Sequence, residues 1–228
     1  EASPSVKFRR PKVMSGFKRF PLFQVDAFSD AIFQGNPAAV VPLEDWIPES
    51  FMQNIAMENQ LSETAFFVSE GDHYALRWFT PTREVDLCGH ATLATAHIIL
   101  SELHVYSDRV VFVSQSGPLL VERKEGGYEM DFPSDEIAAD HDPAVAEALG
   151  AEVESLFRSR NDYLAILPHE SSVRSLQPDF SLLAKLKARG VIASALGEAP
   201  EIDFVSRCFF PKAGIEEDPV TGSAHTTM

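Results

Sequence analysis

Short stretches of alternating or clustered apolar residues recur along the chain and predict a fold built mainly from strands. Period-two alternation, or a brief apolar run between turn residues, is typical of a strand. The segments 64–68 and 74–80 flank a polar turn at Glu70-Gly71-Asp72, so we expect them to pair. The full set of predicted strands covers residues 20–28, 38–41, 64–68, 74–80, 109–114, 119–124, 128–132, 163–167, 191–195 and 202–209.

Helical spacing of apolar residues is confined to a few segments. One helix is predicted from Pro48 to about Met57. The segment 89–100 is apolar or small on every side, which predicts a buried helix. Shorter helices are predicted at 144–149 and 180–188, and a last one begins at Gly222.

A pattern of the form x-Gly-x-Ala occurs twice, at Cys88–Ala91 and at Thr221–Ala224. Each copy follows a predicted strand and opens a helix that contains alanine. This repetition predicts two pseudo-repeated halves. Because little chain follows Gly222, we expect the second half to lack its last strands.

The composition of the chain changes at the expected domain boundaries. Residues 1–15 are polar and basic, and we interpret them as a tail or an expression remnant. Residues 16–133 are expected to form the first domain. Residues 134–142 are acidic and loop-like, which is typical of an interdomain linker. Residues 143–228 then form the second, incomplete domain.

The charge and the cysteine content exclude several classes of protein. A formal net charge of −15 argues against nucleic-acid or anionic-membrane partners, because both require a basic surface. Two cysteines, Cys88 and Cys208, do not provide a disulfide framework, which favours a cytoplasmic location. No run of 18 apolar residues is present, so no membrane span is predicted.

Glu63, His90 and Asp218 are the candidate proton-transfer residues. Glu63 precedes the apolar segment Thr64–Val68, and desolvation there would raise its pKa. His90 lies at a predicted helix start, which favours neutral imidazole. Each residue also has a structural interpretation: a solvated strand-end glutamate, a capping histidine and a capping aspartate. Local sequence leaves both interpretations open.

Sequence motifs for a metal or a nucleotide cofactor are missing from the chain. Cys88, His90, His97 and His225 could supply metal ligands, but no CxxC or HExxH spacing occurs, so no metal site is predicted. His97 is interpreted as a core residue. Neither GxGxxG nor GxxxxGK[ST] is present, so no dinucleotide or ATP site is predicted.

Taken together, the motifs resemble those of the phenazine-biosynthesis PhzF-like isomerase family, within the diaminopimelate epimerase-like superfamily. The resemblance runs from about Phe20 to Met228. It implies an α/β (α+β) fold with two similar domains, each a curled, mostly antiparallel sheet or barrel around a central helix. It also implies an active site between the domains, a homodimer and no cofactor. The motifs that carry the resemblance are Phe23-Gln24-Val25-Asp26-Ala27-Phe28, Gly35-Asn36-Pro37-Ala38-Ala39-Val40, Leu61-Ser62-Glu63-Thr64-Ala65-Phe66, Phe79-Thr80-Pro81, Glu84-Val85-Asp86-Leu87-Cys88-Gly89-His90-Ala91-Thr92 and Glu217-Asp218-Pro219-Val220-Thr221-Gly222-Ser223-Ala224-His225.

The resemblance also implies roles for individual residues. Glu63 would be the acid/base glutamate, assisted by His90 and Asp218. A small carboxylate-bearing substrate, similar to a dihydro-hydroxyanthranilate, would be held by residues next to these groups: Ser62, Gly89, Gly222 and Ser223.

Two other functions remain open from the sequence. Two-thiol racemases of this superfamily carry a cysteine at the start of each repeated helix, and here those positions hold Cys88 and Thr221. An epimerase or dehydratase that uses Cys88 with a different partner is one alternative. A non-catalytic binding or interaction protein with a relic site is the other.

Overall fold

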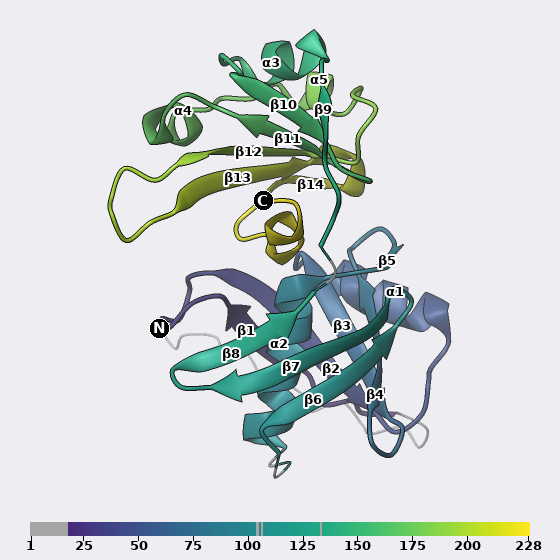
Figure 1. Ribbon diagram of the computed structural model, residues 1–228. Coiled ribbons are helices and arrows are strands. Elements are labelled where there is room, and N and C mark those ends of the chain that lie inside the picture. Colours follow the sequence, from purple (N-terminus) through teal and green to yellow (C-terminus); the bar gives the residue numbers. More distant parts are fainter. Residues whose placement is uncertain (1–17, 104, 106, 133) are drawn as a thin grey trace, which may run out of the picture.

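The computed structural model describes residues 18–228 except 104, 106 and 133. Two curled sheets, one from each half of the chain, lie one above the other with a short helix between them (Figure 1). The tail predicted at 1–15 lies outside the described residues. No helix in the described part of the chain is long and apolar enough to cross a membrane.

The N-terminal sheet is mostly antiparallel and has the order β1-β2-β3-β4-β6-β7-β8, with β5 paired to β4. Only the pairs β2–β3 and β4–β6 are parallel. Its strands are β1 (Phe23–Ala27), β2 (Asn36–Leu43), β3 (Glu63–Ser69), β4 (Tyr74–Phe79), β5 (Glu84–Val85), β6 (Arg109–Ser114), β7 (Gly117–Lys124) and β8 (Gly127–Asp131).

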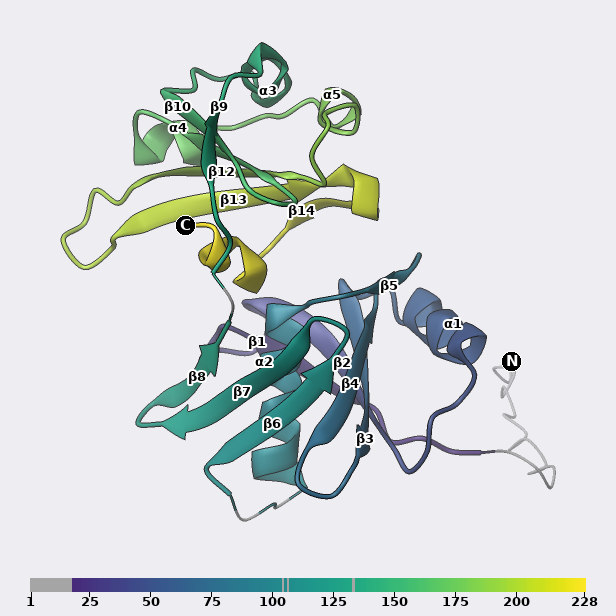
Figure 2. The ribbon, with the colours of Figure 1, turned by 45° about the vertical axis from the view of Figure 1, so that its right-hand side comes forward.

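Helix α2 (Gly89–His97) runs inside the curl of this sheet and continues as a π-helical turn, η1 (Ile98–Glu102) (Figures 1 and 2). Alternate residues of β3 face opposite sides, as strand geometry requires. Ala65 and Phe67 pack toward α2, whereas Phe66 packs toward helix α1 (Glu49–Asn59) on the outer face. Both faces of β3 are therefore buried, which explains its continuous apolar run.

The C-terminal sheet has the order β14-β13-β12-β11-β10-β9, and only β11–β12 is parallel. Its strands are β9 (Ala138–Asp140), β10 (Ser155–Arg158), β11 (Tyr163–Ile166), β12 (Val191–Leu196), β13 (Phe204–Phe210) and β14 (Ile215–Asp218). One face packs against residues of the helices α3 (Pro143–Leu149), α4 (Glu170–Arg174) and α5 (Phe180–Leu183). The opposite face packs against Ala224 of the 3₁₀ helix η3 (Gly222–Thr226), and a short turn, η2 (Pro211–Ala213), joins β13 to β14.

The two halves repeat the same order of strand pairings. In the first half, β1–β2 is antiparallel, β2–β3 is parallel, and β3–β4 and β4–β5 are antiparallel. In the second half, β10–β11 is antiparallel, β11–β12 is parallel, and β12–β13 and β13–β14 are antiparallel. A helix with glycine as its first residue follows each series: α2 in the first half and η3 in the second. The fold is thus of the diaminopimelate epimerase-like kind, with two similar halves.

Several local predictions differ from the structure. The helix predicted at 180–188 ends at Leu183, and the linker predicted at 134–142 contains strand β9, which pairs with β10. The sequence patterns missed the elements β5, β10, α4 and β14. All of these segments are short, and their side chains alternate poorly between apolar and polar, so neighbouring strands rather than local propensity determine their structure.

Candidate active site

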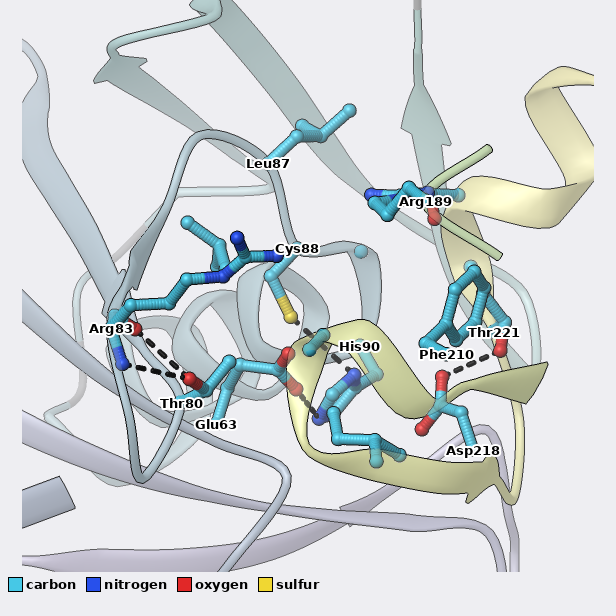
Figure 3. Close-up of a pocket in the computed structure, with 16 residues that line it drawn as sticks. Glu63, Thr80, Arg83, Leu87, Cys88, His90, Arg189, Phe210, Asp218 and Thr221 are labelled. Carbon is cyan, nitrogen blue, oxygen red and sulfur yellow. Dashed lines mark hydrogen bonds and ion pairs between the residues drawn. The ribbon is translucent and has the colours of Figure 1, made fainter. Parts of the chain in front are cut away.

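A pocket of about 540 Å³, counting the space open to solvent, lies between the two halves of the molecule. The N-terminal half contributes the start of β3, the turn after β4 and the start of α2. The C-terminal half contributes the end of β13, strand β14 and the start of η3. Figure 3 shows Glu63, Cys88 and His90 together, with Asp218 and Thr221 on the side of the C-terminal half. Neither half alone forms this pocket.

Glu63 is the first residue of β3 and is buried at the pocket. Desolvation raises its pKa from 4.5 to about 8, and the nearby charge of Asp218 adds to the rise. The neighbouring Cys88 thiol and the Arg189 guanidinium oppose it. A carboxyl group with a pKa close to neutral can both accept and return a proton, which is the property that an acid/base catalyst needs.

His90 is the second residue of α2, and its imidazole is 3% exposed. Burial lowers its pKa to about 4, so the ring is neutral near pH 7. Its Nε2 atom lies 3.4 Å from Oε2 of Glu63, but the contact does not have hydrogen-bond geometry, and Nε2 has no other partner among the described residues. A buried ring nitrogen without a partner is available to a bound ligand or water.

Asp218 ends β14 and is held by hydrogen bonds from both halves of the chain. Asn36 donates to Oδ1 at 2.6 Å, and the Thr221 hydroxyl donates to Oδ2 at 2.5 Å. Burial raises the pKa of Asp218, while these two hydrogen bonds lower it. The pocket therefore contains two carboxyl groups, Glu63 and Asp218, and the charge of Asp218 disfavours ionisation of Glu63.

Gly89 and Gly222 bring the two helix starts into contact. A Cβ atom on Gly89 would lie 3.1 Å from Cα of Gly222, and the reverse distance is the same. Both backbones line the pocket, so the free N–H groups at the start of α2 are close to any ligand bound there. The absence of a side chain at both positions permits this approach.

The model of the phenazine biosynthesis-like protein family matches residues 25–228. The chain belongs to this family. The "uncharacterized isomerase PA2770" of Pseudomonas aeruginosa is 50% identical over 210 residues, covering 91% of this chain and 79% of that protein. A crystal structure of a phenazine biosynthesis PhzF family protein from Enterococcus faecalis has a TM-score of 0.83 and 51% identity, covering 91% of this chain and 80% of that one.

A predicted epimerase of P. aeruginosa, PA4716, shares the fold of this PhzF-like protein with a TM-score of 0.69. It is 21% identical and covers 91% of this chain and 79% of its own. At that identity the similarity concerns architecture alone. The PhzF-like family and the epimerase-like fold implied by the motifs are therefore confirmed.

Most of the residues that the sequence assigned to the site do line the pocket. They are Glu63, Gly89, His90, Asp218, Gly222 and Ser223. Ser62 is half-buried but is not among the lining residues. His97 lies at the far end of α2, where its Nδ1 contacts the Tyr128 hydroxyl at 3.0 Å, in keeping with a packing role.

Sequence reasoning missed several polar residues of the site, among them Asn36, Arg83 and Arg189. Asn36 is fully buried and also donates to the carbonyl of Val220 at 2.9 Å, so it joins the first half to the second. Arg83 and Arg189 line the pocket from opposite halves. Asn36 lies within the Gly35–Val40 motif and Arg83 lies between two of the motifs that carry the resemblance, whereas no motif surrounds Arg189.

Cys88 precedes α2 at the pocket, with its sulfur 3.4 Å from Nδ1 of His90. Burial, and then the charge of Glu63, raise the pKa of this thiol well above its ordinary value. The group is therefore a neutral thiol near pH 7, and it is a weak nucleophile and a weak base in that form.

Glu63, Cys88 and His90 bring their potential metal-ligand atoms within 4.8 Å of one another. A metal ligand must be deprotonated, and burial favours the protonated forms of both Glu63 and Cys88. The two ring nitrogens of His90 also face different neighbours. A metal bound there would have to displace the protons that burial favours on Glu63 and Cys88.

Proposed function

We propose that this PhzF-like protein is an isomerase that moves a proton within a small carboxylate-bearing molecule, with Glu63 as the acid/base group. The buried position of Glu63, with a pKa of about 8, is the observation that supports this proposal most strongly. At neutral pH such a group is distributed between its two protonation states. It can therefore serve as base in one step and as acid in the next.

In the proposed reaction the Glu63 carboxylate removes a proton from one carbon of a conjugated substrate. The electron pair of that C–H bond enters the conjugated system, and the double bonds shift toward a second carbon. The same carboxyl group then returns the proton to that carbon, so that the substrate is isomerised without oxidation or reduction. No cofactor is needed for these steps.

The surrounding groups would hold the substrate during this transfer. The N–H groups at the start of α2, next to Gly89, are suited to the substrate carboxylate. Neutral His90, with its unpaired Nε2, can donate to or accept from the substrate, depending on its tautomer. Asp218, with a raised pKa, can donate when protonated. Hydrogen bonds that strengthen as negative charge develops lower the barrier.

Proton NMR in deuterated buffer with trans-2,3-dihydro-3-hydroxyanthranilate tests this proposal. We expect wild-type protein to convert the compound and Glu63→Gln to be slower by at least about 100-fold, because glutamine cannot accept the proton. Glu58→Gln, on the exposed face of α1, is the matched control and should retain full activity. No conversion by folded wild-type protein would exclude this substrate.

A Cys88→Ser variant separates the isomerase from the alternative of a Cys88-dependent epimerase or dehydratase. Because burial keeps the thiol protonated, we expect this variant to retain activity within about tenfold of wild type. Complete loss in Cys88→Ser, together with activity in Glu63→Gln, would favour the thiol chemistry. Absence of turnover of any small carboxylate by folded wild-type protein would favour a binding protein with a relic site.

A further inference from the structure

Arg189 lies in the pocket next to the position where the second half would be expected to mirror Glu63. Glu63 directly precedes the β3–β4 pair Thr64–Phe79, and Gly190 directly precedes the β12–β13 pair Val191–Phe209. Gly190 has no side chain, and its neighbour Arg189 lines the pocket instead (Figure 3). The pseudo-repeat thus places a base on one side and a cation on the other.

The guanidinium of Arg189 is fixed by a buried partner. Its Nε atom donates to Oδ1 of Asp162 at 2.9 Å, and its Nη2 atom donates to Oδ2 at 2.5 Å. Asp162 is 4% exposed. The guanidinium also lies over the ring of Phe210, 5.0 Å from the centroid. A bidentate pair combined with stacking leaves the side chain little rotational freedom.

The backbone that carries Arg189 is also held in place. Its N–H donates to the carbonyl of Asn161 at 2.8 Å. The ammonium group of Lys212 donates to the carbonyls of Leu186 and Ala188, just before it in the chain. A Cβ atom on Gly190 would lie 2.2 Å from the Phe210 ring, so only glycine allows the ring to approach the strand here. The position of the cation is therefore built into the fold.

One edge of the guanidinium remains free. Nε and Nη2 face Asp162, whereas Nη1 makes no hydrogen bond to any residue that the structure describes. The Arg189 side chain is 36% exposed. An arginine whose first edge is occupied can still bind a second carboxylate through its remaining N–H groups.

We propose that Arg189 forms a second anion subsite, so that the substrates of this protein carry two acidic groups. One would bind at the start of α2 and the other at the free edge of the guanidinium. The first of these placements rests on the proposed function; the second rests on Arg189 alone. Arginine cannot act as a base at any relevant pH, so the residue would bind and select substrates rather than move protons.

Arg83 is the other arginine of the pocket and the natural competitor for this role. It is exposed and forms no ion pair among the residues the structure describes. Ordering its long side chain around a ligand would cost more conformational entropy than using the fixed guanidinium of Arg189. We therefore assign the second subsite to Arg189.

Calorimetric titration with benzoate and with the three benzene dicarboxylates tests the assignment without requiring turnover. Phthalate, isophthalate and terephthalate hold two carboxylates at three fixed spacings, and benzoate is the monoanion reference. We expect at least one dicarboxylate to bind wild-type protein about tenfold or more tightly than benzoate. Arg189→Gln should abolish that gain and leave benzoate binding unchanged.

The controls separate ligand binding from folding. Arg189→Gln leaves buried Asp162 without its partner, so the double variant Arg189→Gln/Asp162→Asn removes the whole pair and should give the same binding result. Arg174→Gln, which breaks an ion pair with Glu170 outside the pocket, should bind all four acids as wild type does.

Several results would overturn the assignment. Wild-type protein could bind benzoate and all three dicarboxylates equally, or it could bind none of the four acids. The two Arg189 variants could lose benzoate binding as much as dicarboxylate binding. Finally, the tighter binding of the dicarboxylate could be lost in Arg83→Gln and not in the Arg189 variants. The isomerase proposal is judged separately, by conversion in the NMR assay. A protein that converts the ring substrate but binds no diacid more tightly would retain the proposed function and lose this inference.

Discussion

At the residue scale, the site is defined by burial of ionisable groups. Desolvation favours the neutral forms of Glu63, Cys88 and His90, and each contributes in a different way. The pKa of Glu63 remains close enough to neutral pH for the carboxyl group to ionise in part, whereas the pKa of the Cys88 thiol is too high for it to ionise. The same physical effect thus leaves Glu63 as the one of these three groups whose raised pKa suits the proposed proton transfer.

The stability of the protein should depend on pH through Glu63. Its folded-state pKa, about 8, exceeds its unfolded value of about 4.5, so between these values the folded chain binds more protons than the unfolded chain. The free energy of unfolding therefore falls as pH rises through this window. Glutamine does not titrate, so Glu63→Gln should gain about 2–4 kcal/mol relative to wild type between about pH 5 and about pH 9.

Urea denaturation at the two pH values, followed by tryptophan fluorescence, measures this difference. A stability difference between wild type and Glu63→Gln that does not change with pH would show that Glu63 has an ordinary pKa. Glu58→Gln again serves as the control, because Glu58 is exposed and does not line the pocket.

At the scale of elements, the starts of α2 and η3 are the most constrained parts of the fold. Substituting alanine for Gly89 would place a methyl group 3.1 Å from Cα of Gly222 and 3.4 Å from its carbonyl carbon. These are backbone atoms, so one helix start must move.

We expect Gly89→Ala to destabilise the protein by about 1–3 kcal/mol through this overpacking, although alanine favours helices. Carboxylate binding should weaken as well, because the N–H groups at the start of α2 would be displaced. Gly127→Ala is the control, since a methyl group there would meet nothing within 4 Å and the residue has no positive φ. Thermal unfolding and benzoate titration of both variants test this. A stabilised Gly89→Ala would show that helix propensity outweighs the contact.

Elements with strong apolar periodicity could be predicted from the sequence, and elements formed by tertiary pairing could not. The paired strands at 64–68 and 74–80 were confirmed as β3 and β4, which are antiparallel. Strand β14 was missed because its sequence, Ile-Glu-Glu-Asp, is acidic; it pairs with β13 alone among the described strands. The helix predicted at 180–188 stops early, and Lys212 binds two of the later carbonyls.

The site was predictable to the extent that it is carried by local motifs. Glu63, His90 and Asp218 each lie within a motif, and the structure brings them to one pocket. Arg189 has no such signal, because its place in the pocket depends on Asp162, Phe210 and Lys212, which are distant in sequence. Asn36 lies within a motif but was given no role in the site, although it donates to Asp218 across the molecule.

At the scale of the whole molecule, a strongly acidic protein carries two arginines in its pocket. The formal net charge is −15, yet Arg83, Arg189 and a helix start face the ligand space. The negative net charge therefore repels an approaching anion at long range, whereas the arginines and the helix start attract it at short range. Salt screens the long-range repulsion more than the short-range attraction, because the pocket is partly buried.

For an anionic substrate we expect kcat/KM to increase as sodium chloride is raised from about 10 mM to about 300 mM, because the Debye length falls over this range from about 30 Å to about 6 Å. Steady-state rates across this series measure the effect, and binding of uncharged benzamide is the control. A steady decrease of kcat/KM with salt would show that the local cations dominate at long range as well.

The enclosure of Glu63 has a consequence for the history of the transferred hydrogen atom. If Glu63 moves the proton as proposed, we expect burial of its carboxyl group, which is 9% exposed, to slow exchange with solvent enough for return to the substrate to compete. Part of the hydrogen removed from one carbon would then reappear in the same molecule at the next. In deuterated buffer the product should therefore carry less than one solvent deuterium per turnover at the newly protonated carbon, and a specifically labelled substrate should keep part of its label through the reaction.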